Sequence, residues 1–363
     1  MPSSAQLEKT MKKSILSLAV LGACALATPT QAADVTPFGN LNEGFVYTHT
    51  TGDYLVNKTT FKLDSWITQP TYLGVKGKEK LNDQLETGFY LDNYFDINNG
   101  QSAVPSKLFS KEAYLYLENS FGKLVLGRLG GLTTPYSTFD NFFTYTDAFH
   151  SLRNDEAFVL MHVLNNAVAY QTPKISGFQG TAIYSFSTDE DYKNKSSENE
   201  RYLGVGATYT LNDLLLTANY ETVYPIGGGK KPERISVGGN YLWDQWQFFA
   251  RFQYNKHLND FYDIINSEKI PWDLDLVSAS VSVSYTTGPH KFMGGLQGNH
   301  LKWTTKLSPK QTVNSYTGLL GYQYSLSAQT SLFADVNLQH IRYHNAPARS
   351  NVLTIYSGIN HRF

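Results

Sequence analysis

The chain has 363 residues, and its 30 basic and 31 acidic side chains give a net charge of −1. This balance lacks the bulk positive charge that nucleic-acid-binding domains carry, so no nucleic-acid partner is expected. Hydrophobic residues make up 41% of the chain, which also holds 25 tyrosines, 21 phenylalanines, 28 glycines and one cysteine. This composition favours an all-β protein, and a wide barrel with water inside needs an apolar surface only on its outer face.

The N-terminus has the pattern of a targeting segment. Lys12 and Lys13 precede a short apolar run over residues 15–27, and Thr30-Gln31-Ala32 places small residues before a cleavage point. We predict a secretory signal peptide over residues 1–32, with Met11 as the natural start, and a single barrel domain over residues 33–363. One alternative stays open, because Leu21-Gly22-Ala23-Cys24 resembles a lipoprotein-processing box that would lipidate Cys24.

Segments with a period of two recur along the mature chain. In residues 277–285, Val277, Ala279, Val281, Val283 and Tyr285 alternate with four serines, and residues 85–92, 246–255 and 332–340 alternate in the same way. The last thirteen residues, 351–363, also alternate and end on Phe363. Each segment has the roughly ten residues that a tilted strand needs to cross the apolar layer of a membrane.

The connections between these segments alternate in length. Short turns are predicted at residues 79–83, 120–122, 174–177, 212–213, 244–245, 288–290 and 326–329. Longer polar loops are predicted at residues 50–58, 97–107, 130–165, 188–199, 224–231, 258–272, 304–310 and 345–350. Fifteen connections imply sixteen strands. The pattern predicts a 16-stranded antiparallel transmembrane β-barrel with short periplasmic turns and long extracellular loops.

The loop at residues 130–165 differs from the others because it is long and rich in aromatic residues. An aromatic-rich loop left in water would expose a large apolar patch, and loops of this length are usually functional. We therefore expect this third long loop to fold inward against the barrel wall. Its charges are mainly acidic: Asp140, Asp147, Asp155 and Glu156.

Three motifs carry a family resemblance. Residues 120–128 (SFGKLVLGR) resemble the fifth-strand motif of the trimeric general porins of Gram-negative bacteria, in their neisserial and β-proteobacterial branch. Residues 73–81 (LGVKGKEKL) are similar to the strand-two motif of that branch, and residues 357–363 (SGINHRF) to its carboxy-terminal motif. One departure is Tyr72, which stands where the family usually has an arginine.

The resemblance implies a water-filled channel, narrowed where acidic residues of the third loop face basic residues of the wall. Carried onto this chain, the acidic side is Asp140, Asp147, Asp155 and Glu156, and the basic side is Arg128, Lys62 and Lys111. The resemblance also implies a homotrimer in the Gram-negative outer membrane, surrounded by lipid that includes lipopolysaccharide. Phe363 would be the signal that the barrel-assembly machinery recognises in the C-terminal strand.

The histidines and the aromatic residues at strand ends give weaker indications of a functional site. The histidines show no metal-ligand spacing on one face, so no metal or cofactor is predicted. Aromatic residues near strand ends are interpreted as interface girdles, with a sugar-stacking track inside the barrel as the alternative for a few of them. These are Tyr47, Trp66, Tyr114, Tyr209, Tyr220, Trp243, Trp272, Trp303 and Tyr343.

The leading functional hypothesis is a passive outer-membrane channel for ions and small hydrophilic solutes rather than an enzyme. The principal alternative is a substrate-specific channel for an anion, an amino acid or a sugar. A barrel enzyme would need a Ser-His pair near the girdle, which the chain does not offer, and an adhesin barrel would usually have eight strands.

Overall fold

The computed structural model describes residues 34–53, 57–152, 158, 163–188, 193–258, 273–304, 311–344 and 348–363. Within these residues the chain forms seventeen β-strands and one 3₁₀ turn, η2 (Ser196–Glu198). The strands are β1 (Asp34–Gly52), β2 (Lys58–Ser65), β3 (Tyr72–Asn82), β4 (Leu85–Tyr94), β5 (Ala113–Asn119), β6 (Gly122–Gly130), β7 (Val163–Gln171), β8 (Phe178–Ser185), β9 (Arg201–Leu211), β10 (Leu214–Tyr224), β11 (Glu233–Trp243), β12 (Trp246–Lys256), β13 (Asp273–Thr287), β14 (His290–Thr304), β15 (Gln311–Ser325), β16 (Thr330–Tyr343) and β17 (Arg349–Arg362).

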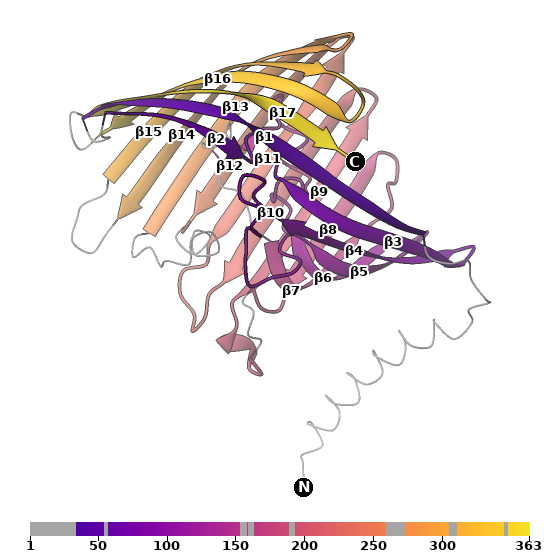
Figure 1. Ribbon diagram of the computed structural model, residues 1–363. Coiled ribbons are helices and arrows are strands. Elements are labelled where there is room, and N and C mark those ends of the chain that lie inside the picture. The colour runs from indigo at the N-terminus through magenta and orange to yellow at the C-terminus, as the bar shows by residue number, and fades with distance from the viewer. Residues whose placement is uncertain are drawn as a thin grey trace.

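The strands form one closed antiparallel sheet. Neighbours along the chain pair with each other, apart from β2 and β3, and the last strand, β17, pairs with β1 in a register that runs from Asn40↔Arg362 to Gly52↔Ser350. Figure 1 shows the two strands side by side, the first in indigo and the last in yellow. Closure matters because an open sheet edge carries unpaired N–H and C=O groups, which an apolar membrane does not tolerate.

The strands β2 and β3 are two halves of one wall crossing. Both pair with β1, β2 through residues 43–50 and β3 through residues 34–40, while residues 66–71 leave the ladder between them. Counting β2 and β3 as one crossing turns seventeen described strands into sixteen, which confirms the predicted 16-stranded antiparallel barrel.

The break in this crossing differs from the uninterrupted strand that the sequence predicted. Trp66 adopts a φ of 60°, which no regular strand contains. The Asn42 side chain replaces the hydrogen bonds that a neighbouring strand would provide. Its Oδ1 accepts hydrogen bonds from the backbone N–H groups of Ile67 (2.8 Å) and Thr68 (3.1 Å). The side chains at 66 and 67 are aromatic and β-branched, which favours a strand locally. The bonds to Asn42, which is distant in sequence, stabilise the break instead.

The two faces of the sheet have opposite polarity, as the period-two segments predicted. The inner face is polar and includes Arg251, Gln253 and Asn255 on β12, and Ser280 and Ser282 on β13, all of them buried. Phe248, Phe252 and Val281 alternate with these residues and are 43%, 39% and 57% exposed on the outer face. A barrel of this polarity is stable where its outside meets lipid and its inside meets water.

Six strands are longer than the ten or so residues that the sequence predicted, and β1, with 19 residues, is the longest of them. The strands β13 to β17 have 14 or 15 residues each. A crossing needs only about 9–11 residues, so these strands extend beyond the apolar band of the barrel.

The aromatic girdle residues divide between the two faces. Trp243 and Tyr209, at the short-connection end of the barrel, are 63% and 38% exposed on the outside, as expected. The girdle assignment is wrong for Tyr114, which is 5% exposed and stacks on Tyr90 inside the barrel. It is also wrong for Trp66, whose ring lies 4.7 Å from that of Tyr94 in the break, measured between centroids. Trp272 lies outside the described residues.

The connections alternate in length along the described strands. β3 and β4, β9 and β10, and β11 and β12 are each joined by two residues, whereas β4 and β5 are separated by eighteen residues and β6 and β7 by thirty-two. None of the helical segments in the described part of the chain has the length and apolar character needed to span a membrane.

Candidate functional site

The segment after β6, residues 131–152, packs against the inner face of the barrel. We call it the interior segment. Five of its apolar side chains are at most 6% exposed: Leu132, Phe139, Phe142, Phe143 and Phe149. Phe149 belongs to a cluster with Phe249, Met293 and Leu319, which lie on the inner faces of β12, β14 and β15. Burial of these large side chains is the main apolar contribution to holding the segment in place.

The base of the interior segment is fixed by Glu112, which is fully buried. Its carboxylate accepts hydrogen bonds from the backbone N–H of Gly130 (3.1 Å) and from the N–H and hydroxyl of Thr138, the latter at 2.9 Å. The Lys111 ammonium lies 3.7 Å from the same carboxylate and 2.7 Å from that of Asp92. A buried carboxylate is stable only when charges and donors surround it, and Glu112 has both.

A second attachment joins the interior segment to β10 and β11. The Thr133 hydroxyl donates to Glu221 (2.7 Å) and accepts from Arg234 (2.7 Å). Glu221 also accepts the hydroxyl of Tyr202 (2.6 Å), and Arg234 donates to Asn255 (2.8 Å). The Arg234 and Glu221 side chains have no exposed surface, so this ion pair is shielded from water and salt.

A third attachment joins the segment to β12, β13 and β14. The Asp147 carboxylate accepts a hydrogen bond from the hydroxyl of Ser282 (2.9 Å) and lies 3.6 Å from the guanidinium of Arg251. The next residue, Ala148, donates its N–H to Ser282 (3.0 Å), and its carbonyl accepts from Lys291 (2.7 Å). An acidic residue of the segment therefore contacts a basic residue of the wall directly.

The break at residues 66–71 provides the fourth attachment. The Thr68 carbonyl accepts the N–H of Leu152 (3.1 Å) and the hydroxyl of Tyr136 (3.3 Å). The Ser151 hydroxyl lies 3.0 Å from that of Tyr356 on β17. The break and the interior segment therefore contact each other inside the barrel, and together they fill part of its cross-section.

Asp140 organises the interior segment itself. Its carboxylate accepts backbone N–H groups from Phe142 (3.1 Å), Phe143 (2.9 Å) and Thr144 (3.2 Å), and the Thr144 hydroxyl at 2.7 Å. Burial raises the pKa of Asp140 to about 6. The carboxylate is thus directed into the turn that it stabilises, in the manner of a cap.

The predicted wall cations lie in three different settings. Lys62 is on the inner face of β2, with a side chain 55% exposed and 2.8 Å from Asp64. Lys111 is also inside the barrel but is buried between Asp92 and Glu112. Its ammonium lies 4.6 Å from the centre of the Tyr72 ring. Tyr72 is the residue that stands where the porin family usually has an arginine, so Lys111 places a positive charge next to that position.

Arg128 is directed away from the inner face. Val125 and Leu129 on the same strand are buried on the inner face, and Arg128 has the opposite parity. It pairs across the sheet with Ala113. Leu115 and Leu126, which share the parities of Ala113 and Arg128, are exposed on the outer face. The Arg128 guanidinium donates to the carbonyl of Ser110 (2.8 Å) and to Asn165. These bonds join it to neither Asp140 nor Asp147. Asp155 and Glu156 lie outside the described residues.

The sequence analysis missed six charged residues of the site: Asp92, Glu112, Glu221, Arg234, Arg251 and Lys291. Arg251 had a signal, because it alternates with exposed Phe248 and Phe252 and so belongs to the polar face. The same parity argument applies to Arg234 and Lys291. The pairing of Asp147 with Arg251 had no signal, because 104 residues separate the two.

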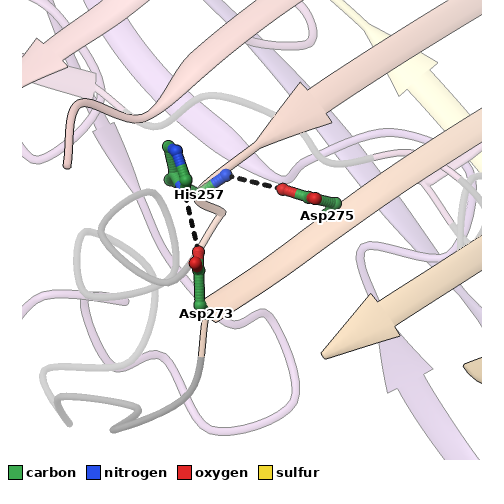
Figure 2. Close-up of side chains that lie close together, drawn as sticks. All are labelled: His257, Asp273 and Asp275. Carbon is green, nitrogen blue, oxygen red and sulfur yellow. Dashed lines mark hydrogen bonds and ion pairs between the residues drawn. The ribbon is translucent and has the colours of Figure 1, made fainter. Parts of the chain in front are cut away.

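Figure 2 shows a polar group at the end of β12 and the start of β13, formed by His257, Asp273 and Asp275. A potential metal-binding atom of each lies within 4.8 Å of the others. The His257 ring is 2.6 Å from Asp273, and its backbone N–H donates to Asp275 (3.1 Å). Lys230 forms an ion pair with Asp273. Because this lysine already neutralises Asp273, we interpret the group as a link between strand ends and assign it no metal.

The closed barrel, its apolar outside and its polar, partly filled inside define the class of outer-membrane channels. A family model described as Gram-negative porin matches residues 17–343. The chain therefore belongs to the Gram-negative porin family, and its place is the outer membrane.

Individual relatives agree with this assignment. An outer membrane porin protein of Bordetella pertussis is 25% identical over 395 residues, which cover 97% of this chain and all of that protein. The structure of an anion-selective porin from Comamonas acidovorans covers 91% of this chain and 100% of its own, with a TM-score of 0.64 and 20% identity. OmpT of Vibrio cholerae in its trimer form covers 92% of this chain and 100% of its own, with a TM-score of 0.61 and 13% identity.

Proposed function

We propose that this porin is a passive, water-filled channel for ions and small hydrophilic solutes, narrowed by the interior segment. The observation that carries the proposal is the attachment of residues 131–152 to the polar inner wall at Glu112, Glu221, Arg251 and Thr68. A segment held inside a barrel reduces the width available to solutes, and width sets the size limit of passage.

The sidedness of the barrel is part of the same proposal. The two-residue connections, such as that between β11 and β12, would face the periplasm, and the longer ones would face the outside of the cell. The connection between β6 and β7 is then the third long loop, counted after those that follow β1 and β4. On this basis the interior segment belongs to the inward-folded third loop of the porin family.

The charges of the narrowing fall into two groups. Asp147 and Arg251 are buried against each other, as are Glu112 and Lys111, so we assign these four to attachment of the segment. Lys62 remains a candidate for direct contact with passing ions, since its side chain is 55% exposed on the inner face. Asp155 and Glu156 are proposed to complete the acidic side.

A second candidate function is a channel that prefers anions. It is favoured by the lysines on the inner face of β3, and the Comamonas acidovorans relative is described as anion-selective. A positive inner wall would raise the local concentration of anions and lower that of cations.

Assembly and export complete the proposal. Residues 1–32 would be a cleaved signal peptide, with Met11 as the start; these residues, including Cys24, lie outside the described part. We propose a homotrimer in lipid that includes lipopolysaccharide, with Phe363 as the assembly signal. The position of Phe363 suits a terminal marker: its backbone closes the β1–β17 ladder through two hydrogen bonds to Gly39, and the residue is 45% exposed.

The proposal is tested by adding the refolded protein to a planar lipid bilayer in potassium chloride. Stepwise increases in conductance are expected, because each inserted barrel opens a continuous water path. Liposome swelling with sugars of increasing size should show a sharp size limit. Protein that is shown to be folded and inserted, but that gives neither current steps nor sugar entry, would contradict the channel.

A further inference from the structure

The inner wall carries a hollow below the interior segment, toward the short-connection end of β3 to β6. Its volume is about 560 Å³, which is within the range of pockets that bind small organic ligands. We call its lining the lysine–tyrosine wall, defined by Lys76, Lys78, Tyr90, Tyr114, Tyr116 and Lys123. Thr138 of the interior segment lies at its upper edge and is bound to the hydroxyl of Tyr114 (2.8 Å).

The lysine–tyrosine wall has more positive than negative charge. Three ammonium groups line the hollow against one carboxylate, that of Asp34, which pairs in register with Lys78. Among the described residues, Lys76 and Lys78 have no ion-pair contact with an acidic side chain. Lys123 is 3.6 Å from Glu118, a side chain that is 49% exposed and therefore weakly held. Two ammonium groups are thus available to an anion that enters the hollow.

The aromatic rings of the wall are held in fixed positions. Tyr90 and Tyr114 stack with centroids 5.4 Å apart and an interplanar angle of 4°. The hydroxyl of Tyr116 is bound to Glu86 (3.0 Å), and the ammonium of Lys123 lies 4.0 Å from the centre of the Tyr116 ring. Rings that are already oriented bind a flat apolar surface with little loss of conformational entropy.

Ammonium groups beside oriented rings match one ligand chemistry. A carboxylate accepts hydrogen bonds from lysine, and an aromatic ring attached to it can stack on tyrosine. A neutral sugar would leave the two free ammonium groups without a charged partner, and a small inorganic anion would leave the rings unused. Resting on the proposed channel function, we propose that the lysine–tyrosine wall is a binding station for aromatic carboxylates on their way through the pore.

The test measures how aromatic carboxylates block the ion current of wild-type protein in a planar bilayer. Potassium benzoate and potassium acetate are added separately to the same chloride solution. Benzoate is expected to reduce the chloride current at concentrations where acetate has no effect, since only benzoate carries a ring. The block should be stronger from the side of the short connections, where the hollow is located.

The variant K76Q/K78Q removes both free ammonium groups, and Y116L removes one ring. The half-blocking benzoate concentration is expected to rise roughly tenfold in the lysine variant and by a smaller factor in Y116L. The control is K80Q, which removes one ammonium group from the same face of β3 but outside the hollow, and it is compared with K76Q and K78Q singly as well as with the double variant. K80Q should remain within about twofold of the wild type, as expected for a distant, screened charge.

Each outcome separates the binding station from the channel itself. Equal block by benzoate and acetate, or equal half-blocking concentrations in wild type and K76Q/K78Q, would overturn the station while the channel remains. An equal effect of K80Q and K76Q/K78Q would reduce it to a general charge effect and also overturn it. Absence of current steps in chloride alone would contradict the channel, which is a different result.

Discussion

At the scale of residues, buried ion pairs stabilise the interior, and the pair of Asp147 with Arg251 joins residues that are far apart in sequence. Asp147 and Arg251 have almost no exposed surface, at 1% and 0% of their side chains, as do Arg234 and Glu221. Removing one member of such a pair leaves the other buried and uncompensated, which typically costs about 3–5 kcal/mol. These pairs determine where the interior segment binds.

The variant Arg251→Met tests this role. It should weaken attachment of the interior segment by about 3 kcal/mol, because Asp147 then loses its counter-charge while Ser282 still donates to it. We expect noisier single-channel current and faster hydrogen exchange over residues 131–152. The double variant D147N/R251M should recover most of the loss. Additive effects of the two single changes would argue against a direct interaction between them.

Acidification should act on the interior segment through two groups with opposite signs. Burial, assisted by the charge of Lys291, lowers the pKa of His150 to about 3, so docking is weakened as pH falls below about 6.5, when the undocked histidine gains a proton. Burial raises the pKa of Asp140 to about 6, so docking is strengthened as pH falls from 6 toward 4.

The two contributions can be separated by substitution. At pH 5 the histidine should disfavour docking by roughly 2 kcal/mol and the aspartate should favour it by roughly 1 kcal/mol. Between pH 7.5 and 5, hydrogen exchange of residues 131–152, corrected for intrinsic rates, should therefore change little in wild type. On the same decrease in pH, hydrogen exchange of these residues should become slower in His150→Gln and faster in Asp140→Asn. The same pH response in all three proteins would show that the pKa of neither group changes when the segment docks.

At the scale of elements, the sequence predicted the strands well because each strand carries its own pattern. The alternation of valine and serine in residues 277–285 reports both faces of β13 without reference to any neighbour. Long-range contacts carry no such local signal. Asn42 stabilises the break at Ile67, and the irregular pairing between Gly127 and Leu129 accompanies the outward position of Arg128.

The candidate site was predictable only in part, for the same reason. Length and aromatic content singled out the loop that holds Asp140 and Asp147. Their contacts depend on residues that lie across the barrel, such as Arg251, or within the same turn, such as Thr144. The alternatives for the aromatic residues were undecided from parity, and the closed sheet places Tyr114 inside.

The variant Glu112→Gln tests the base of the interior segment. A glutamine retains one acceptor but presents an NH₂ group to the donors of Gly130 and Thr138, and it leaves Lys111 with Asp92 as its nearer partner. We expect more frequent current fluctuations with an unchanged barrel, as judged by heat-modifiable migration. Glu198→Gln is the control, because this exposed residue of η2 forms a surface ion pair with Lys195, within the part of the chain that the structure describes. Identical traces for the two variants would remove Glu112 from this role.

At the scale of the whole molecule, closure of β1 on β17 makes the chain a single unit. Gly39 allows the ring of Phe363 to pack on the first strand, since a Cβ there would lie 2.6 Å from the ring. The two backbone hydrogen bonds between Phe363 and Gly39 would be kept by any residue at this position.

The variant Phe363→Ala should therefore separate assembly from function. We expect lower amounts of barrel in the outer membrane of cells, because the exposed terminal aromatic ring is lost. Protein refolded from detergent should conduct as the wild type does. A variant that assembles normally in cells would rule out Phe363 as the assembly signal.

The central claim is that residues 131–152 occupy the inside of the barrel and limit its conductance. The most direct measurement is the single-channel conductance of a variant in which residues 133–150 are replaced by a short Gly-Ser linker, after heat-modifiable migration has shown a folded barrel. We predict a clear increase in conductance and a larger sugar size limit, because the attachments at Glu221, Arg251 and Lys291 are lost together with the segment. A folded variant with the conductance and size limit of the wild type would contradict the account.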